Sequence, residues 1–125
     1  MKRVVLAGLT LTSLAGAAAA WSAAAQPAKD APCFLTRDLR GHTIGDAHTL
    51  YFDVNGKWIY RVTTSNDCLV NATRSDPILL QDRGLGKICH PLDLELTVRG
   101  DRCIITGLTR LAPAEASALP KRLQP

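Results

Sequence analysis

The 125-residue sequence lacks the short motifs that mark several large enzyme classes. It has no Gly-x-Ser-x-Gly turn, no His-Glu-x-x-His helix, no phosphate-binding glycine loop and no dinucleotide fingerprint. It also has no Cys-x-x-Cys pair, the spacing typical of structural zinc sites. We therefore predict no catalytic residues, no metal site and no cofactor.

Between Lys2-Arg3 at the start of the chain and Lys121-Arg122 near its end, the sequence has no run of positively charged residues. Lys2 and Arg3, at the other end, account for two of the 15 basic residues, which leaves 13 against 11 acidic residues in the rest of the chain. A nucleic-acid-binding domain needs a basic stripe or patch. The sequence therefore predicts no nucleic-acid partner.

The first 25 residues have the pattern of a secretory signal peptide. Lys2-Arg3 precedes the apolar run VVLAGLTLTSLAGAAAA, and small residues follow up to Ala25, where we expect cleavage. An uncleaved anchor is the alternative, but the run is rich in Ala, Gly and Thr and poor in Leu, Ile and Phe, which disfavours a spanning helix. We expect a periplasmic or secreted protein with no membrane span after cleavage. Residues 26–32 are predicted to form a disordered leader.

Four cysteines in a small exported chain predict two disulfide bonds. Three connectivities are possible, including pairing in chain order, 33–68 with 89–103. We favour Cys68–Cys89, because these residues bracket the segment with the weakest core pattern. The remaining bond, Cys33–Cys103, would tie the start of the domain to its end.

Aromatic residues are scarce, and four of the six lie in the segment TLYFDVNGKWIYRV at residues 49–62. Asn-Gly between two β-rich runs predicts a hairpin with a two-residue turn at Asn55-Gly56. That register places Tyr51, Trp58 and Tyr60 on one face, and these are the candidate ligand-binding residues. The other face carries Leu50, Phe52, Val54 and Ile59. If a helix or loop covers the aromatic face, both faces belong to the core.

A second hairpin is predicted over Asp93 to Thr109. Leucine and valine alternate with polar residues from position 94 to 98, which indicates a half-buried strand. A turn at Gly100-Asp101 keeps Cys103 among the leucines, whereas a one-residue slip would place Arg102 there. We therefore expect Cys103 to point inward.

The remaining segments predict shorter elements. Phe34 to Leu39 fits either a helical turn or an irregular strand, and Gly41 to Asp46 is expected to be a loop. Pro113 to Leu119 predicts a short helix that Pro120 ends, and residues 120–125 a frayed basic tail. We thus expect one domain, residues 33–119, of the all-β class with one C-terminal helix. Its sheet would be a small barrel or a two-layer arrangement built on the two hairpins.

The sequence resembles a family of small exported bacterial four-cysteine proteins that is catalogued only as a domain of unknown function. The resemblance runs from Cys33-Phe34 to the C-terminus. It rests on the order of the cysteines, with Asp67-Cys68-Leu69 and Arg102-Cys103, and on the C-terminal segment, including Ala-Leu-Pro-Lys-Arg at 118–122. The resemblance implies no activity, substrate or cofactor. In similar proteins the segment around position 42 carries tryptophan, so His42 departs from the pattern.

These observations favour a non-catalytic binding or structural protein of the bacterial envelope, whose partner is an envelope protein or a small ligand. One alternative is a small hydrolase that uses His42 or His48 with Asp38 or Asp46. A second alternative is an inhibitor of an envelope-acting enzyme that presents the 41–46 loop. Asp93 and Glu95 share a strand face as paired carboxylates would, but we assign them to the solvated side of that strand.

Overall fold

The computed structural model describes residues 33–84 and 86–125. The expected signal peptide, residues 1–25, and leader, residues 26–32, lie outside the described residues. In chain order the elements are β1 (Phe34–Leu35), η1 (Thr36–Asp38), β2 (Leu39–Asp46), β3 (Thr49–Val54), β4 (Trp58–Thr64), β5 (Ile78–Asp82), β6 (Lys87–Ile88), η2 (Pro91–Asp93), β7 (Leu94–Val98), β8 (Asp101–Cys103), β9 (Ile105–Arg110), α1 (Pro113–Ala118) and η3 (Lys121–Leu123).

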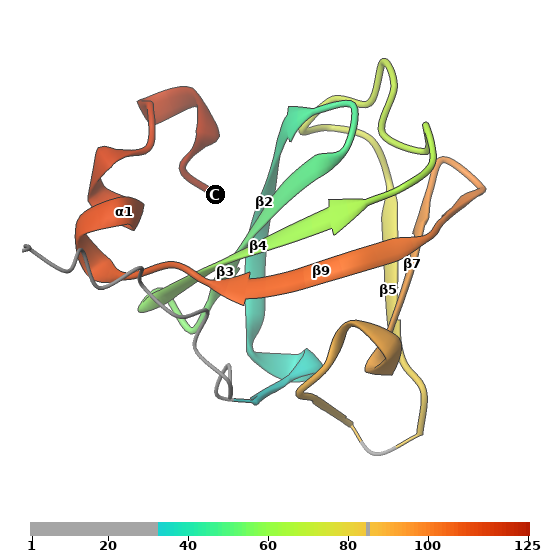
Figure 1. The fold of residues 1–125 in the computed structure, drawn as a ribbon, viewed down its shortest axis with the longest axis horizontal. Helices are drawn as coiled ribbons and strands as arrows, with labels where there is room; N and C mark the ends of the chain where they lie inside the picture. The colour runs from blue at the N-terminus through green and yellow to red at the C-terminus, as the bar shows by residue number, and fades with distance from the viewer. Residues whose placement is uncertain (1–32, 85) are drawn as a thin grey trace, which may run out of the picture.

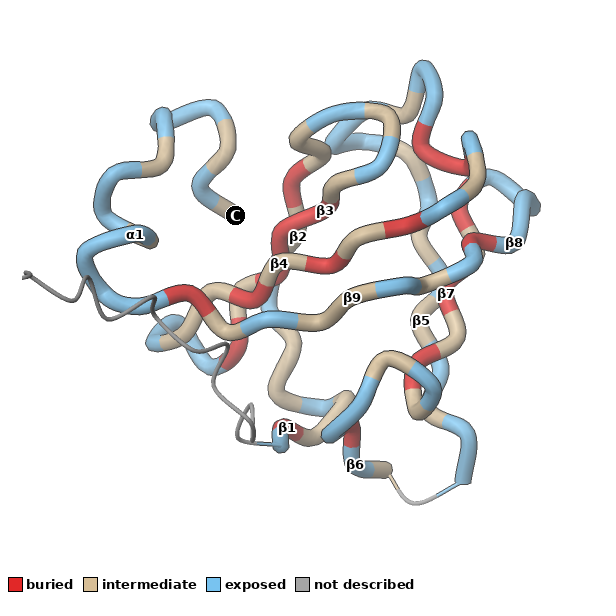
Figure 2. The backbone as a smooth tube through the Cα atoms, viewed as in Figure 1, coloured by how far each residue is buried: buried red, intermediate tan, exposed pale blue. Residues whose placement is uncertain are grey.

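The described strands form three antiparallel sheets (Figure 1). The largest has the order β2-β3-β4-β9, the second β5-β7-β8, and β1 pairs with β6. Side chains from β3, β4 and β7 meet in one buried core, which is red along these strands in Figure 2. The sheets are not closed. The predicted class, β-rich with one short helix and two disulfides, is confirmed, and the closed-barrel option is excluded.

The register of the first hairpin differs from the prediction. Val54 pairs with Trp58, so the turn contains three residues rather than two. Asn55 and Gly56 have φ of 61° and 67°, and the Gly56 N–H donates to the Asp53 carboxylate over 2.8 Å. The one-residue shift turns β4 over relative to β3. Arg61 thereby lies on the face of Tyr51, whereas the predicted register would place it on the face of Leu50 and Phe52.

The corrected register also gives the hairpin one clearly apolar face. That inner face comprises Leu50, Phe52, Val54, Trp58, Tyr60 and Val62. All of them are buried except Trp58, which is half-buried. Apolar residues at every second position are what a strand needs when one side packs on the core.

Residues 41–46, predicted to be a loop, instead form most of β2. Pairing with β3 overrides the local glycine signal, and β-bulges between Leu39 and Gly41 and between Ile44 and Asp46 absorb the irregularity. His42 lies opposite Phe52 on the inner face, whereas Thr43 lies opposite Tyr51 on the outer face. The inhibitory loop proposed for this segment is therefore absent.

The second hairpin is shorter than predicted. Its two-residue turn is Arg99-Gly100, both with positive φ, and Leu96 rather than Val98 pairs with Cys103. This shift by two residues preserves the faces, so the inward position of Cys103 is confirmed; it is 5% exposed. At Ile104 the chain leaves this sheet, and β9 joins the four-stranded sheet beside β4.

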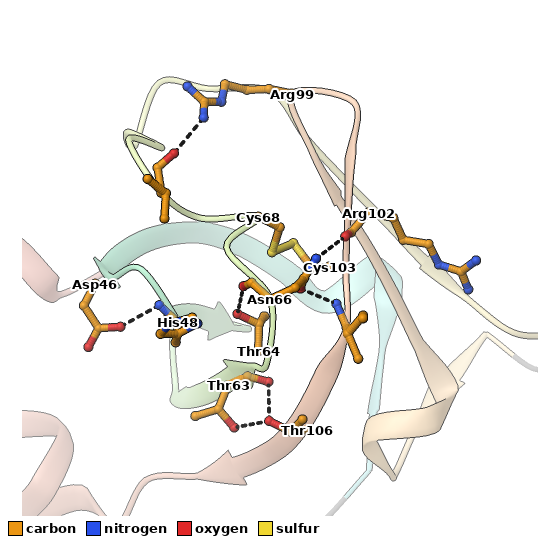
Figure 3. Close-up of a disulfide and its surroundings, with 12 residues drawn as sticks. Asp46, His48, Thr63, Thr64, Asn66, Cys68, Arg99, Arg102, Cys103 and Thr106 are labelled. Atoms are coloured by element: carbon orange, nitrogen blue, oxygen red, sulfur yellow. Dashed lines mark hydrogen bonds between the residues drawn. A yellow bond between two sulfur atoms is a disulfide. The ribbon is translucent and has the colours of Figure 1, made fainter.

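Asn66 stabilises the backbone where the chain passes from the three-stranded to the four-stranded sheet, as its hydrogen bonds in Figure 3 show. Its side-chain amide donates to the Arg102 carbonyl and its carbonyl accepts the Ile104 N–H, both over 2.8 Å. The Ile104 carbonyl accepts the N–H of Ser65. The segment that leads into Cys68 is thereby held against the end of β8, which brings Cys68 to Cys103.

The disulfide pairing Cys68–Cys89 with Cys33–Cys103 was wrong. The bonds are Cys33–Cys89 and Cys68–Cys103. Phe34 pairs with Ile88 across β1 and β6, so the residues flanking that pair, Cys33 and Cys89, lie side by side with Cα atoms 4.2 Å apart. These two cysteines are exposed, whereas Cys68 and Cys103 are buried.

The C-terminal segment covers the outer face of the four-stranded sheet. The predicted helix is confirmed as α1, where Glu115 forms a 3.0 Å ion pair with Arg61 of β4. Beyond it, the Leu123 carbonyl accepts a 2.6 Å hydrogen bond from the Thr43 hydroxyl, and Thr43 is 1% exposed. Residues 120–125 are therefore packed on β2 rather than frayed.

Candidate functional site

The three predicted ligand-binding aromatics do not share a face. Tyr51 lies on the outer face of the sheet and is 9% exposed. Tyr60 lies on the inner face, 2% exposed, with its ring centroid 4.7 Å from that of Phe34. Trp58 is also on the inner face but at the end of its strand, where it remains half-buried. Trp58 is the member of the set that reaches the surface.

Two cationic side chains lie over the Trp58 ring. The guanidinium carbon of Arg110 is 4.3 Å from the ring centroid, and the Lys57 ammonium is 5.2 Å away. An aromatic ring attracts cations at these distances through its quadrupole. Lys57 adjoins Trp58 in sequence, but Arg110 arrives through the pairing of β9 with β4, where it lies opposite Tyr60.

Trp58 contributes to a groove between the first hairpin and the C-terminal segment, which we call the hairpin groove. Its volume is about 540 Å³, within the range of small-molecule sites. The hairpin side carries two opposite charges, Asp53 and Lys57. The full lining is Asp53, Gly56, Lys57, Trp58, Ile59, Pro113, Ala116, Ser117, Gln124 and Pro125.

Some polar groups of the groove already form hydrogen bonds within the protein. One Asp53 oxygen accepts the Gly56 N–H, Ser117 donates to the Pro113 carbonyl, and the Gln124 amide donates to the Leu119 carbonyl. The second Asp53 oxygen and the Lys57 ammonium form no hydrogen bond or salt bridge with the described residues. The groove can therefore offer a ligand one negative charge, one positive charge and an apolar wall.

Tyr60 lies two residues from Trp58 on the same face of β4 and is buried in the core. Burial raises the pKa of its phenol, and the nearby positive charge of Arg110 partly opposes that increase. A phenol with a raised pKa does not act as a base at neutral pH. Tyr60 packs in the core against the ring of Phe34.

The residues of the hydrolase alternative do not assemble into a catalytic set. Within the described residues, neither imidazole bonds to Asp38 or Asp46. The buried Nε2 atom of His42 has no hydrogen-bond partner, and the His48 ring faces Asp67 at 3.7 Å on the surface. Burial, followed by the positive charge of Arg74, lowers the pKa of His42. His42 is therefore a neutral side chain packed against Phe52.

Asp93, Glu95 and His90 also have separate structural roles. Asp93 accepts the N–H groups of Cys89 and His90, which lowers the pKa of its carboxyl, while His90 Nδ1 accepts the Leu92 N–H. Glu95 faces Arg83 and Arg102 instead. In the described part of the chain, no group of three His, Cys, Asp or Glu residues is placed to hold a metal ion.

Sequence reasoning selected Trp58 but missed most of its surroundings. The predicted two-residue turn would pair Lys57 with Val54 on the aliphatic face, and Arg110 has no local signal in the sequence. Pro113 and Ala116 were expected only as helix residues, and the packing of the tail on β2 was not foreseen. The alternation of apolar residues between positions 50 and 62 does predict the observed register, because it places Trp58 on the same face as Val54.

Searches of protein-family models, curated proteins and solved structures found no match to this chain. Among residues 33–84 and 86–125, no helix has the length and apolar character needed to cross a membrane.

Proposed function

We propose that this chain is an exported protein of the bacterial envelope, periplasmic or secreted, that binds a small ligand in the hairpin groove without catalysing a reaction. The observation that carries the binding role is Trp58, half-buried at a groove of about 540 Å³ beside the opposite charges of Asp53 and Lys57. The proposal includes membership of the four-cysteine family of unknown function described above.

The export part of the proposal is supported by the signal pattern of residues 1–25 and by two disulfide bonds. Both bonds are compatible with an oxidising compartment outside the cytoplasm. Expression of the full chain in a bacterial host, followed by fractionation and thiol labelling, tests it. We expect an oxidised protein beginning at Gln26 outside the cytoplasm, and a reduced protein inside when residues 2–25 are deleted. An uncleaved, cytoplasmic full chain would refute export.

The groove favours a ligand with an apolar body and charged ends. Ile59, Pro113 and Ala116 line the apolar wall, while a ligand amine fits Asp53 and a ligand carboxylate fits Lys57. Zwitterionic compounds such as short apolar peptides satisfy all three requirements. The peptide class is thus the first to screen.

Tryptophan fluorescence provides a direct assay. The sequence contains two tryptophans, Trp21 and Trp58, and Trp21 lies in the expected signal peptide. In a chain beginning at Gln26, emission therefore reports Trp58 alone. We expect a library of apolar dipeptides and tripeptides to contain members that shift this emission with saturation.

Matched variants separate groove binding from other effects. Asp53→Asn and Lys57→Gln should each lower the affinity for the tightest-binding peptide by roughly tenfold. Lys87 is an exposed lysine on β6, and Lys87→Gln should leave that affinity unchanged. The absence of saturable binding across the library, or equal losses in all three variants, would reject this groove as the binding site.

A further inference from the structure

The outer face of the three-stranded sheet is exposed to solvent, whereas the C-terminal segment covers the outer face of the four-stranded sheet. Leu79 of β5 is 56% exposed and lies in one cross-strand row with Thr97 of β7 and Arg102 of β8. Figure 1 shows this sheet on the side of the molecule opposite to α1. The face is therefore separate from the hairpin groove.

A second groove of about 340 Å³ adjoins this face, lined by Arg83, Pro91, Leu92, Leu94, Arg102, Cys103, Ile104 and Ile105. Leu92 and Ile104 are 67% and 58% exposed. Two of the four large hydrophobic side chains exposed in the described residues therefore line this one groove. Exposed apolar side chains gathered in this way, rather than scattered, mark interaction sites.

Two arginines flank this apolar groove and share one carboxylate. Arg83 Nε lies 4.0 Å from one Glu95 oxygen, and Arg102 Nε lies 3.6 Å from the other. The terminal nitrogens of both guanidinium groups have no bond to the described residues. Both arginine side chains are more than half exposed. The groove thus has two cations against one anion, with donors free to receive carboxylates.

We propose that this groove, which we call the arginine-flanked groove, docks a segment of another protein that inserts an apolar side chain between Leu92 and Ile104. Acidic side chains on either side of the inserted residue pair with Arg83 and Arg102. Protein interfaces are enriched in arginine and commonly place an apolar core inside a polar rim. Charge complementarity selects an acidic segment over a neutral or basic one.

A second copy of this chain fits the groove less well. A two-fold contact would bring the same positively charged groove onto itself, because such an interface uses one patch twice. Each copy would add an excess positive charge opposite the other. An acidic partner neutralises the excess instead.

A random dodecapeptide phage library tests the proposal. The oxidised protein serves as bait after depletion of the library on a Leu92→Ser/Ile104→Ser variant. Both substitutions are at exposed positions, so the variant should keep its fold, which circular dichroism and urea unfolding check. We expect recovered peptides to share an aliphatic or aromatic residue with Asp or Glu on both sides.

Synthetic versions of the recovered peptides then test the charges. Arg83→Gln/Arg102→Gln should weaken binding by roughly tenfold at low salt, with a smaller loss at high salt. Val70→Ser and Arg122→Gln, an exposed apolar residue and an exposed cation outside the groove, should not change the affinity.

Three results would overturn this inference. The first is the absence of a consensus after depletion, and the second is a neutral or basic consensus that the arginine variants do not weaken. The third is a dimer in sedimentation that Leu92→Ser/Ile104→Ser converts to monomer, which would identify a second copy as the occupant. None of these results bears on the hairpin groove.

Discussion

The two disulfide bonds offer a quantitative test, because one bond is exposed and the other is buried. Two double variants, Cys33→Ala/Cys89→Ala and Cys68→Ala/Cys103→Ala, each remove one bond. Their sequence separations are 56 and 35 residues. In the chain-entropy model each bond stabilises the fold by about 4 kcal/mol, with the longer loop ahead by about 0.4 kcal/mol. Entropy alone therefore predicts a slightly larger loss of stability when the Cys33–Cys89 bond is removed.

Packing reverses that order. Cys68 and Cys103 are 4% and 5% exposed and belong to the core cluster that contains Leu69 and Leu96. Alanine at both positions removes two buried sulfur atoms, which costs about 1 kcal/mol for each atom. We expect the Cys68→Ala/Cys103→Ala variant to be about 1–2 kcal/mol less stable than the other double variant.

Urea unfolding followed by circular dichroism measures the difference, with the slope of unfolding free energy against urea as a check on the two-state treatment. A stabilising osmolyte added equally to all samples keeps the weaker variant folded. A larger loss in Cys33→Ala/Cys89→Ala would refute the packing argument. In the unmodified protein, mild reduction followed by alkylation should label Cys33 and Cys89 first; simultaneous labelling of Cys68 and Cys103 would contradict their protection by the core.

Three further predictions concern individual residues. Gly107→Ala should destabilise the fold by about 2 kcal/mol in urea unfolding, because its Cβ would overlap the Thr63 hydroxyl, whereas Gly41→Ala, with 3.7 Å of clearance, should not. For His42, the folded-state pKa lies below the ordinary value, so the unfolded chain binds the proton first and stability falls as the pH drops through the ordinary imidazole pKa of about 6.5. His42→Gln should flatten that decrease, and an unchanged slope in His42→Gln would show that His42 is not its source. Deletion of residues 120–125 should expose Thr43 and lower the urea midpoint, and an unchanged midpoint would show that the tail adds no stability.

The sequence predicted the β-rich class, the C-terminal helix and the inward position of Cys103 because local patterns encode each of them. Strand alternation fixed the face of Cys103, and a shift of two residues in the turn left that face unchanged. In the first hairpin the same rule had the opposite effect. A one-residue error in the turn exchanged the faces of β4 and separated Tyr51 from Trp58.

The features that sequence reasoning missed depend on residues far apart in the chain. Residues 41–46 form a strand because β3 supplies hydrogen-bonding partners, although Gly41 and Gly45 locally favour a loop. Arg110 reaches Trp58 only through strand pairing, and Leu123 reaches Thr43 across 80 positions. Spacing alone cannot decide which cysteines meet, because the pairing of Phe34 with Ile88 is itself a tertiary contact.

The connectivity of the cysteines has a consequence for how the protein acquires its bonds. The two bonds cross in sequence, since Cys68 lies between Cys33 and Cys89, and Cys103 lies beyond both. A chain that enters an oxidising compartment N-terminus first presents Cys33 and Cys68 together before Cys89 arrives. Any Cys33–Cys68 bond formed at that stage must be exchanged through a mixed disulfide to reach the native pairing. If the proposed export is correct, maturation through such a Cys33–Cys68 intermediate requires disulfide isomerisation in addition to an oxidant.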